Sequence, residues 1–332
     1  MKSPLKWVGG KTQLLPQLFQ DTRLEGTFVS YYEPFVGGGS VMTKLLEDQA
    51  HPDASARITD NFHASDINPA LIGFYVCVQT HVEALIAELQ PLCDAYSNAP
   101  KDTSAPKQRR SSKAHVAATL SEACLYGQED VYYWARQTFN QYLKQPDLLQ
   151  CPKAAALFLF LNKTGFRGIY RTSQMGFNVP FGHYKNPSIY DKDHLRCFAK
   201  LIAPVTFRCE SFETALERVA PQSLVYLDPP YVPVKVTSFV SYTSNGFGSE
   251  AIRSFFEQSA LASTIKDVRV VLSNSAAPAV IERLKSMNNF SYITCSCRRA
   301  IHSKNPASRE TEVIAWSSPC EVLPDDNDVP VQ

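Results

Sequence analysis

The chain has 332 residues, of which 44% are hydrophobic and 20% are charged, and its formal net charge at pH 7 is +1. Such a chain can bury a large core in one domain with an insertion, or in two domains. The small net charge excludes a protein that binds a polyanion over its whole surface. The nine cysteines include no C-x-x-C pair, and their odd number favours reduced thiols in the cytosol. With no amino-terminal signal pattern or long apolar run, neither export nor a membrane span is expected.

The first predicted strand covers residues 28–32, which are aromatic and β-branched. Glu33, Pro34 and Phe35 follow it, then three glycines at 37–39, and then apolar residues at helical spacing. Glycine allows positive φ and lets a ligand approach the backbone closely, so this loop predicts a cofactor site. The spacing is not the G-x-G-x-x-G of a dinucleotide site, and the alternative is a tight turn between strand and helix.

The second predicted strand ends at Asp66. An acidic residue at that position can hold the two hydroxyls of a ribose. Together, the glycine loop and Asp66 fit a dinucleotide or another adenosine cofactor.

A mostly helical region is predicted next, with apolar residues at helical spacing in 70–76, 82–89, 131–134 and 154–161. Residues 97–121 interrupt it with a stretch rich in Ser, Pro, Ala and Lys, which predicts a flexible surface insertion. Residues 151–200 contain eight basic and two acidic residues, which indicates a local nucleic-acid face. The alternative is an ordinary solvated surface.

The most informative motif is Asp228-Pro229-Pro230-Tyr231, which follows a short apolar strand at 223–227. Ligands bind at the carboxyl ends of strands in open α/β sheets. Asp228 can accept a hydrogen bond from an amine, Pro229 offers only its carbonyl, and Tyr231 offers a flat face for stacking. The motif therefore suits a planar heterocycle that carries an amino group. The alternative is a plain turn at the end of a strand.

Further strands are predicted at 205–208 and 268–274, and two late strands, 290–297 and 312–316, are predicted to form a hairpin at the sheet edge. Cys295 and Cys297 alternate within the first of these late strands, which favours one face of a strand over a metal site. Alternating strands and helices predict a mostly parallel sheet covered on both faces.

Residues 5–11 (LKWVGGK), 33–40, Asp66, 157–187 and 228–231, in this order, resemble the Dam-type DNA adenine-N6 methyltransferases. The resemblance implies an α/β fold: the seven-stranded, mostly parallel, Rossmann-like sheet of class I S-adenosylmethionine-dependent methyltransferases, with an inserted helical target-recognition domain. It assigns residues 1–68 and 191–317 to the catalytic domain and 69–190 to target recognition. Residues 318–332 are expected to be a disordered tail.

The resemblance also implies which residues act. The tetrapeptide would be catalytic, and no metal is expected. The residues expected to bind S-adenosylmethionine are Trp7, Lys11, Glu33, Pro34, Phe35, Gly37, Gly39, Ser40, Asp66 and Asp228. The residues expected to contact DNA are Lys6, Lys163, Phe166, Arg167, Arg171, Asn178, Tyr184, Arg298 and Arg299.

The expected reaction is methyl transfer to N6 of an adenine flipped out of double-stranded DNA, with GATC as the leading target. The chain departs from the family pattern at Phe166, Arg167 and Ile169, where Tyr, Asn and Leu are usual. Alternatives are methylation of cytosine N4, RNA or a protein glutamine, a nucleotide-binding protein without catalysis, and a nicotinamide oxidoreductase. We expect a monomer in the cytoplasm of a bacterial or phage-infected cell, with its role left open among restriction, regulation and a viral function.

Overall fold

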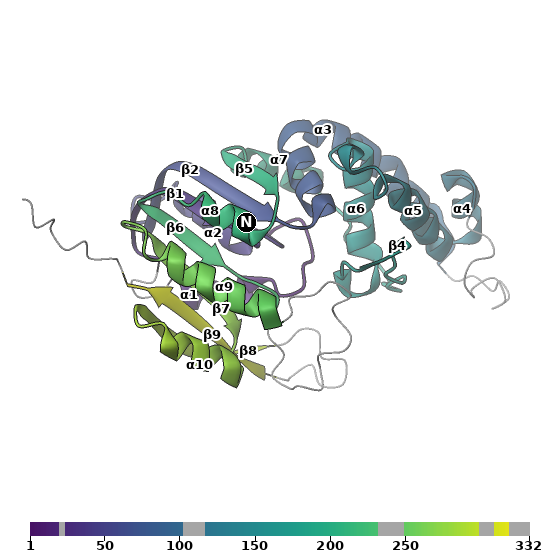
Figure 1. Cartoon of the computed structure of the whole chain (residues 1–332). Helices are drawn as coiled ribbons and strands as arrows, with labels where there is room; N and C mark the ends of the chain where they lie inside the picture. Colours follow the sequence, from purple (N-terminus) through teal and green to yellow (C-terminus); the bar gives the residue numbers. More distant parts are fainter. Residues whose placement is uncertain (20–23, 102–116, 232–248, 299–308, 319–332) are drawn as a thin grey trace, which may run out of the picture. The chain divides into compact units, whose positions relative to one another are not determined.

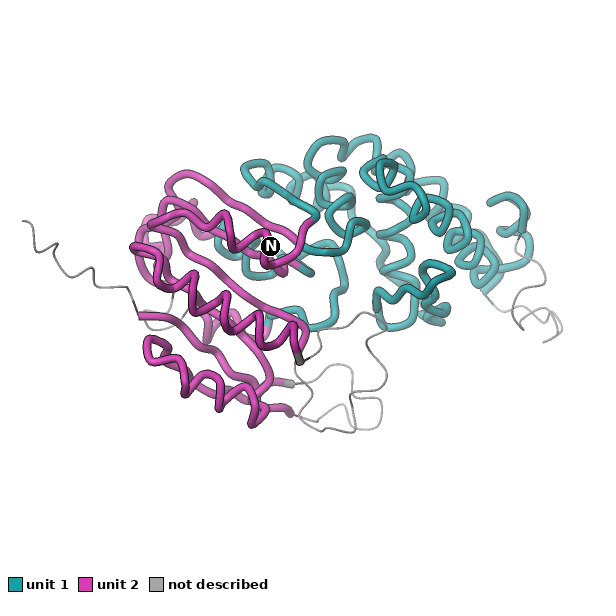
Figure 2. Tube along the Cα trace, viewed as in Figure 1, with its two compact units in different colours: residues 1–12, 37–47, 66–209 teal, residues 13–36, 48–65, 210–332 magenta. Residues whose placement is uncertain are grey.

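The computed structural model describes residues 1–19, 24–101, 117–231, 249–298 and 309–318. It divides the chain into two compact units, each built from three segments (Figures 1 and 2). Unit 1 contains residues 1–12, 37–47 and 66–209, and unit 2 contains residues 13–36, 48–65 and 210–332. The predicted division into catalytic and target-recognition domains stays a prediction.

A seven-stranded sheet has the strand order β5-β2-β1-β6-β7-β9-β8. The strands are β1 Gly26–Glu33, β2 Ala56–Asp66, β5 Val205–Cys209, β6 Ser223–Leu227, β7 Arg269–Ser275, β8 Phe290–Arg298 and β9 Arg309–Ser317. β1 is parallel to β2 and β6, β6 is parallel to β7, and β9 is antiparallel to both β7 and β8. This confirms the predicted fold class, a mostly parallel class I methyltransferase sheet, and the late antiparallel pair at its edge.

The core of unit 2 lies on both faces of its strands. One face buries Val225, Val270 and Val313 with residues of the helices α8 (Phe212–Glu217), α9 (Ser249–Ala262) and α10 (Pro278–Ser286). Figure 1 shows α8 and α9 over these strands. The neighbouring residues Tyr226 and Val271, which point to the other face, are 1% and 0% exposed. Burial on both faces explains why residues 223–227 are continuously apolar rather than alternating with polar residues.

Unit 1 is mainly helical. Its helices are α2 Ser40–Asp48, which ends at the unit boundary, α3 Pro69–Asn98, α4 Leu120–Tyr126, α5 Gln128–Tyr142, α6 Pro152–Thr164 and α7 Lys192–Leu201. Shorter elements of the chain are α1 Leu15–Leu18 in unit 2, the 3₁₀ turns Lys11–Gln13, Pro146–Leu148 and Phe166–Gly168, and the hairpin strands β3 Thr172–Ser173 and β4 Gly176–Phe177. The predicted helical stretches 70–76 and 82–89 form the single helix α3, which departs from helical geometry at His81 (φ −139°, ψ 37°).

The helix α3 has the length and apolar composition of a membrane span, but 56% of its most apolar 18-residue window is buried inside the protein. Its Phe74 ring lies 5.6 Å from Phe158 of α6, and its Tyr75 ring stacks on Phe207 of β5 at 5.0 Å. Burial against other elements of unit 1 identifies α3 as a core helix.

Two predicted segments fall largely outside the described residues. Of the predicted insertion at 97–121, residues 102–116 lie outside them, while Asn98 ends α3 and Leu120 begins α4. Of the predicted tail, residues 319–332 lie outside them, as does Arg299.

Candidate active site

The Asp-Pro-Pro-Tyr tetrapeptide lies at the carboxyl end of β6 in unit 2. Asp228 and Tyr231 are half-buried, Pro229 is buried and Pro230 is exposed. Since β1, β6 and β7 run parallel, Glu33, Asp228 and Ser275 mark the same edge of the sheet. This is the edge at which open α/β sheets bind ligands.

Asp228 is held by a neighbour on β7. Ser273 Oγ donates a hydrogen bond of 3.0 Å to Asp228 Oδ1, and Tyr226 Oη lies 2.9 Å from Ser273 Oγ. A serine hydroxyl has a single hydrogen, so Tyr226 is the donor in the second bond when Ser273 donates to Asp228. Burial, together with the negative charge of Asp228, raises the pKa of Tyr226 well above its usual value, and the phenol therefore keeps its proton.

Tyr231 is fixed by an acidic residue on β9. Its hydroxyl donates a hydrogen bond of 2.6 Å to Glu312 Oε2. Burial raises the pKa of Tyr231, and the charges of Asp228 and Glu312 raise it further. The bond fixes the position of the ring, as the expected stacking role requires.

A second tyrosine–carboxylate pair lies at the end of β1. Glu33 is 3% exposed, and Tyr31 Oη donates a hydrogen bond of 2.7 Å to its Oε2. The charge of Glu33 also helps to raise the pKa of Tyr226, so the two pairs are close enough to interact. We refer to the set of Asp228, Ser273, Tyr226, Tyr231, Glu312, Glu33 and Tyr31 as the acid–tyrosine network.

Two further residues expected at the cofactor lie beside Glu33. Pro34 is buried. Phe35 packs into the core of unit 2, with its ring 5.3 Å from Phe212 and 6.1 Å from Phe255. Their predicted contact with a cofactor stays a prediction.

The glycine loop and Asp66 are joined in unit 1. Gly37 and Gly39 have φ of +46° and +64°, the left-handed region that favours glycine. Gly37 N donates to Asp66 Oδ2 at 3.2 Å, and Asn68 N donates to Oδ1 at 3.0 Å. Tyr75 Oη donates to the Gly37 carbonyl at 2.9 Å, a contact that the helical spacing of residues 70–76 did not reveal.

Asp66 has the chemistry of a ribose ligand. Burial raises the pKa of its carboxyl group, while the backbone N–H donors of Asn68, Gly37 and Ile67 oppose that shift. Each carboxylate oxygen can accept two hydrogen bonds, so the three backbone donors leave one of the four acceptor positions for a ribose hydroxyl. The residues present therefore fit an adenosine cofactor.

The amino-terminal motif packs against this loop. A β carbon at Gly38 would lie 2.9 Å from Cβ of Trp7, so only glycine fits there. The half-buried Trp7 ring stacks 6.2 Å from Tyr170. Lys11 is 5% exposed, and its Nζ donates to the Gly9 carbonyl at 2.7 Å. Ser40, the first residue of α2, is half-buried.

Lys6, one of the residues expected to contact DNA, is held by Asn162 of α6. Asn162 Oδ1 accepts from Lys6 N at 2.8 Å, and its Nδ2 donates to the carbonyls of Lys6 at 2.7 Å and Gly168 at 3.2 Å. Gly168 has φ of +65°, and a β carbon there would lie 2.7 Å from Cβ of Lys6. Asn162 thus clamps two backbone segments, a role that the sequence did not reveal.

Several predicted DNA-contacting residues lie together in unit 1. Lys6 Nζ lies 4.4 Å from the ring centroid of Tyr184, whose hydroxyl accepts from Arg167 N at 2.9 Å. Arg167 has φ of +58°, and its guanidinium carbon lies 5.0 Å from the ring centroid of Phe166, which is 43% exposed. Burial, aided by the positive charge of Lys6, lowers the pKa of Lys163 to about 8.

A neighbouring pair extends this group. Arg171 Nε donates to Asn178 Oδ1 at 2.7 Å, beside the β3–β4 hairpin. We refer to Lys6, Lys163, Phe166, Arg167, Arg171, Asn178 and Tyr184 as the recognition cluster. Arg298 ends β8 in unit 2.

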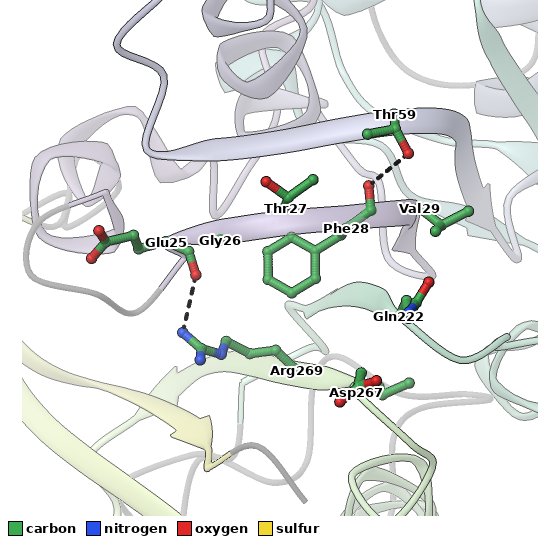
Figure 3. Close-up of a pocket in the computed structure, with 10 residues that line it drawn as sticks. Glu25, Gly26, Thr27, Phe28, Val29, Thr59, Gln222, Asp267 and Arg269 are labelled. Carbon is green, nitrogen blue, oxygen red and sulfur yellow. Dashed lines mark hydrogen bonds between the residues drawn. The ribbon is translucent and has the colours of Figure 1, made fainter.

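A cavity of about 420 Å³ in unit 2 lies away from these residues (Figure 3). It is lined by residues at the amino ends of β1 and β7 and by Gln222, just before β6. Figure 3 shows Arg269 beside the Glu25 carbonyl at this cavity, where the two groups are 3.3 Å apart. Because it lies at the opposite ends of the strands from Glu33 and Asp228, it is separate from the acid–tyrosine network.

Comparison with known proteins identifies the family. The model of the D12 class N6 adenine-specific DNA methyltransferases matches residues 7–304. The chain belongs to this family. It is therefore an adenine-specific DNA methyltransferase, which confirms the resemblance and decides against the alternatives on cytosine, RNA and protein. Membership implies S-adenosylmethionine as methyl donor and DNA as substrate.

Relatives cover most of the chain. A type II methyltransferase, M.MjaIII, of Methanocaldococcus jannaschii is 36% identical over 255 residues, 75% of this chain and 76% of its own. A DNA adenine methylase of Vibrio cholerae is 33% identical over 245 residues, 73% of this chain and 70% of its own. The retron Ec67 DNA adenine methylase of Escherichia coli is 29% identical over 324 residues, 96% of this chain and 92% of its own.

Proposed function

We propose that this methyltransferase transfers the methyl group of S-adenosylmethionine to N6 of an adenine flipped out of duplex DNA, and that its target is GATC. It acts as a monomer in the cytoplasm of a bacterial or phage-infected cell. The observation that carries the proposal is the half-buried Asp228 carboxylate at the carboxyl end of β6, next to the buried Pro229 and the anchored Tyr231.

The adenine amine is a poor nucleophile because its lone pair conjugates with the ring. Asp228 and the Pro229 carbonyl each accept a hydrogen bond from the N6 amine. These two bonds favour a pyramidal nitrogen and stabilise the positive charge that develops on it. Tyr231 stacks on the base. When bound, S-adenosylmethionine supplies a methyl group on a positively charged sulfur. No residue of the chain needs to form a covalent intermediate.

The glycine loop and Asp66 hold the cofactor. Asp66 accepts a hydrogen bond from a ribose hydroxyl, and the backbone at Gly37 and Gly39 gives the ligand a close approach. Trp7 packs against the ligand and Lys11 meets its carboxylate. The other residues expected to bind the cofactor are Glu33, Pro34, Phe35 and Ser40.

DNA is held by the recognition cluster. Lys6 and Arg171 donate to the O6 and N7 acceptors of guanine, while Lys163 and Asn178 contact phosphates. Phe166 and Arg167 fill the space that the flipped adenine leaves. Flipping costs a few kcal/mol, which stacking and these contacts offset. Arg298 or Arg299 adds a phosphate contact.

The GATC target rests on the resemblance of residues 157–187 to Dam-type enzymes, with Phe166, Arg167 and Ile169 as the departures. A panel of short duplexes, with GATC and each single-base variant, tests it through transfer of a tritiated methyl group. We expect kcat/KM to fall about tenfold or more when either outer base pair is changed. Equal methylation of all variants, or preference for another sequence, would overturn the target.

A further inference from the structure

We propose that Ser273, held by Tyr226, is a positioning residue that fixes which oxygen of Asp228 accepts the adenine amine. The inference rests on the proposed function and adds two residues to its machinery. Both residues are buried: Ser273 is 0% and Tyr226 is 1% exposed, although each carries a hydroxyl. Buried hydroxyls are costly unless they form hydrogen bonds, and these two bond to each other and to Asp228.

The order of donors and acceptors in this series of hydrogen bonds follows from the hydrogens available. Tyr226 donates to Ser273, and Ser273 donates to Asp228 Oδ1 at 3.0 Å. If Tyr226 accepted the serine hydrogen in place of Asp228, it could not also donate its own hydrogen to Ser273. Successive hydrogen bonds in a buried chain polarise one another, which strengthens the bond to the carboxylate. The result is a carboxylate whose Oδ1 is engaged and whose rotation is restricted.

The same series of hydrogen bonds stabilises the ionised form of the Asp228 carboxyl group. The charges of Asp228, Glu33 and Glu312 each help to raise the pKa of Tyr226, so all three carboxylates act electrostatically on this one site. Like charges disfavour the ionised form of a carboxyl group, whereas a donated hydrogen bond favours it. Ser273 therefore helps Asp228 to remain a carboxylate, the form that accepts hydrogens from the amine. The charge of Asp228 also acts on Tyr231, a further titratable group of the network.

The register of the sheet makes this contact possible. β6 and β7 pair in parallel with Leu227 opposite Leu272, so the next residues along the two strands, Asp228 and Ser273, are neighbours. Both side chains then point to the same face, which is also the face of Tyr226. Ser273 is thus the residue of β7 placed to reach Asp228.

The test compares two variants with two matched controls. Ser273→Ala removes the donor to Asp228, and Tyr226→Phe removes the donor to Ser273 while the ring stays. The controls are Ser223→Ala, a 0% exposed serine on β6 whose hydroxyl has no partner among the described residues, and Tyr32→Phe, a buried tyrosine whose hydroxyl donates to the Arg218 carbonyl. Melting temperatures and dissociation constants for cofactor and duplex DNA are measured for all four.

We expect Ser273→Ala to lower kcat about tenfold and Tyr226→Phe about threefold, with the KM for DNA unchanged. The acid limb of the kcat profile moves to higher pH in both variants, and Ser273→Thr restores much of the activity. The controls keep the wild-type kcat and pH profile. If Ser273→Ala is unstable, the kcat and pH profile of Tyr226→Phe test the inference, because that variant keeps the ring and leaves no large cavity.

Two results would overturn the inference. A kcat and pH profile of Ser273→Ala and Tyr226→Phe that match those of Ser223→Ala and Tyr32→Phe would exclude the positioning role while the proposed function stands. A wild-type protein that transfers no methyl group to adenine would overturn the proposed function itself, and this inference with it.

Discussion

The acid–tyrosine network and the recognition cluster are built in opposite ways. In the network, acidic residues are paired with hydroxyl donors, and most of its members are buried, as the hydrogen bonds of Ser273 to Asp228 and of Tyr31 to Glu33 show. In the cluster, cations lie near neutral groups at the surface: Lys6 over the ring of Tyr184, and Arg171 on the amide of Asn178. The carboxylate proposed to take part in the chemistry is thus fixed by hydroxyl donors, while Lys6 and Arg171, which are proposed to contact DNA, have neutral partners and no paired acid in these contacts.

The sharpest test of the contrast is the loss of the carboxylate. Replacing Asp228 with alanine removes the acceptor for the amine, so we expect kcat to fall about a hundredfold or more while the cofactor affinity changes only a few-fold. Single-turnover methyl transfer and calorimetric binding measure the two effects. Asp60→Ala, an exposed acid on β2, serves as the control. Activity near that of the control would remove Asp228 from the mechanism.

A change in the recognition cluster should alter selectivity instead. Arg171→Met removes a guanidinium expected to donate to guanine, so kcat/KM on the preferred duplex should fall about tenfold or more. Duplexes changed at that base pair should lose much less, because the discriminating contact is gone. Lys192→Met, an exposed lysine of α7, is the control. An equal loss on every duplex would show that Arg171 contacts only phosphate.

For Asp66, at the end of β2, we expect a moderate effect of pH on the affinity for S-adenosylmethionine. Burial raises the pKa of Asp66, so it takes up a proton at a higher pH than an ordinary aspartate as the pH is lowered. Protonation removes an acceptor for the ribose hydroxyls, and affinity for S-adenosylmethionine should fall as the pH drops through that raised pKa. Asp66→Asn should bind about tenfold more weakly at neutral pH and lose this dependence. The same pH dependence in Asp66→Asn would assign it to another group.

The smallest expected effect concerns Lys163. Its pKa is lowered to about 8, so it carries a full charge only below that pH. A phosphate contact made by the charged form should weaken as the pH rises through this value, by a few-fold in the dissociation constant for duplex DNA. Fluorescence anisotropy at constant ionic strength measures it, with Lys163→Met expected to show no such decline. A wild-type affinity that stays constant between pH 7 and 9 would exclude the contact.

The sequence predicted the strands of the sheet and the loops that carry Gly37, Asp66 and Asp228, because periodicity and turn residues are local signals. It did not predict the partners of these residues. Ser273 lies 45 positions from Asp228, and Glu312 lies 81 positions from Tyr231. Such contacts depend on strand order and register, which no local pattern specifies. The bonds of Asn162 were likewise not predicted, because Asn162 and its partner Lys6 are 156 positions apart in the sequence.

The central claim is that the chemistry occurs on the amine of adenine at Asp228. The most direct measurement uses S-adenosylmethionine labelled in its methyl group, duplex DNA, and chromatography of the nucleosides after complete digestion. We expect the label in N6-methyldeoxyadenosine with the wild-type protein, and about a hundredfold less of it or lower with Asp228→Ala at equal reaction time. Label in a methylated cytosine, or undiminished N6-methyldeoxyadenosine with the variant, would contradict the account.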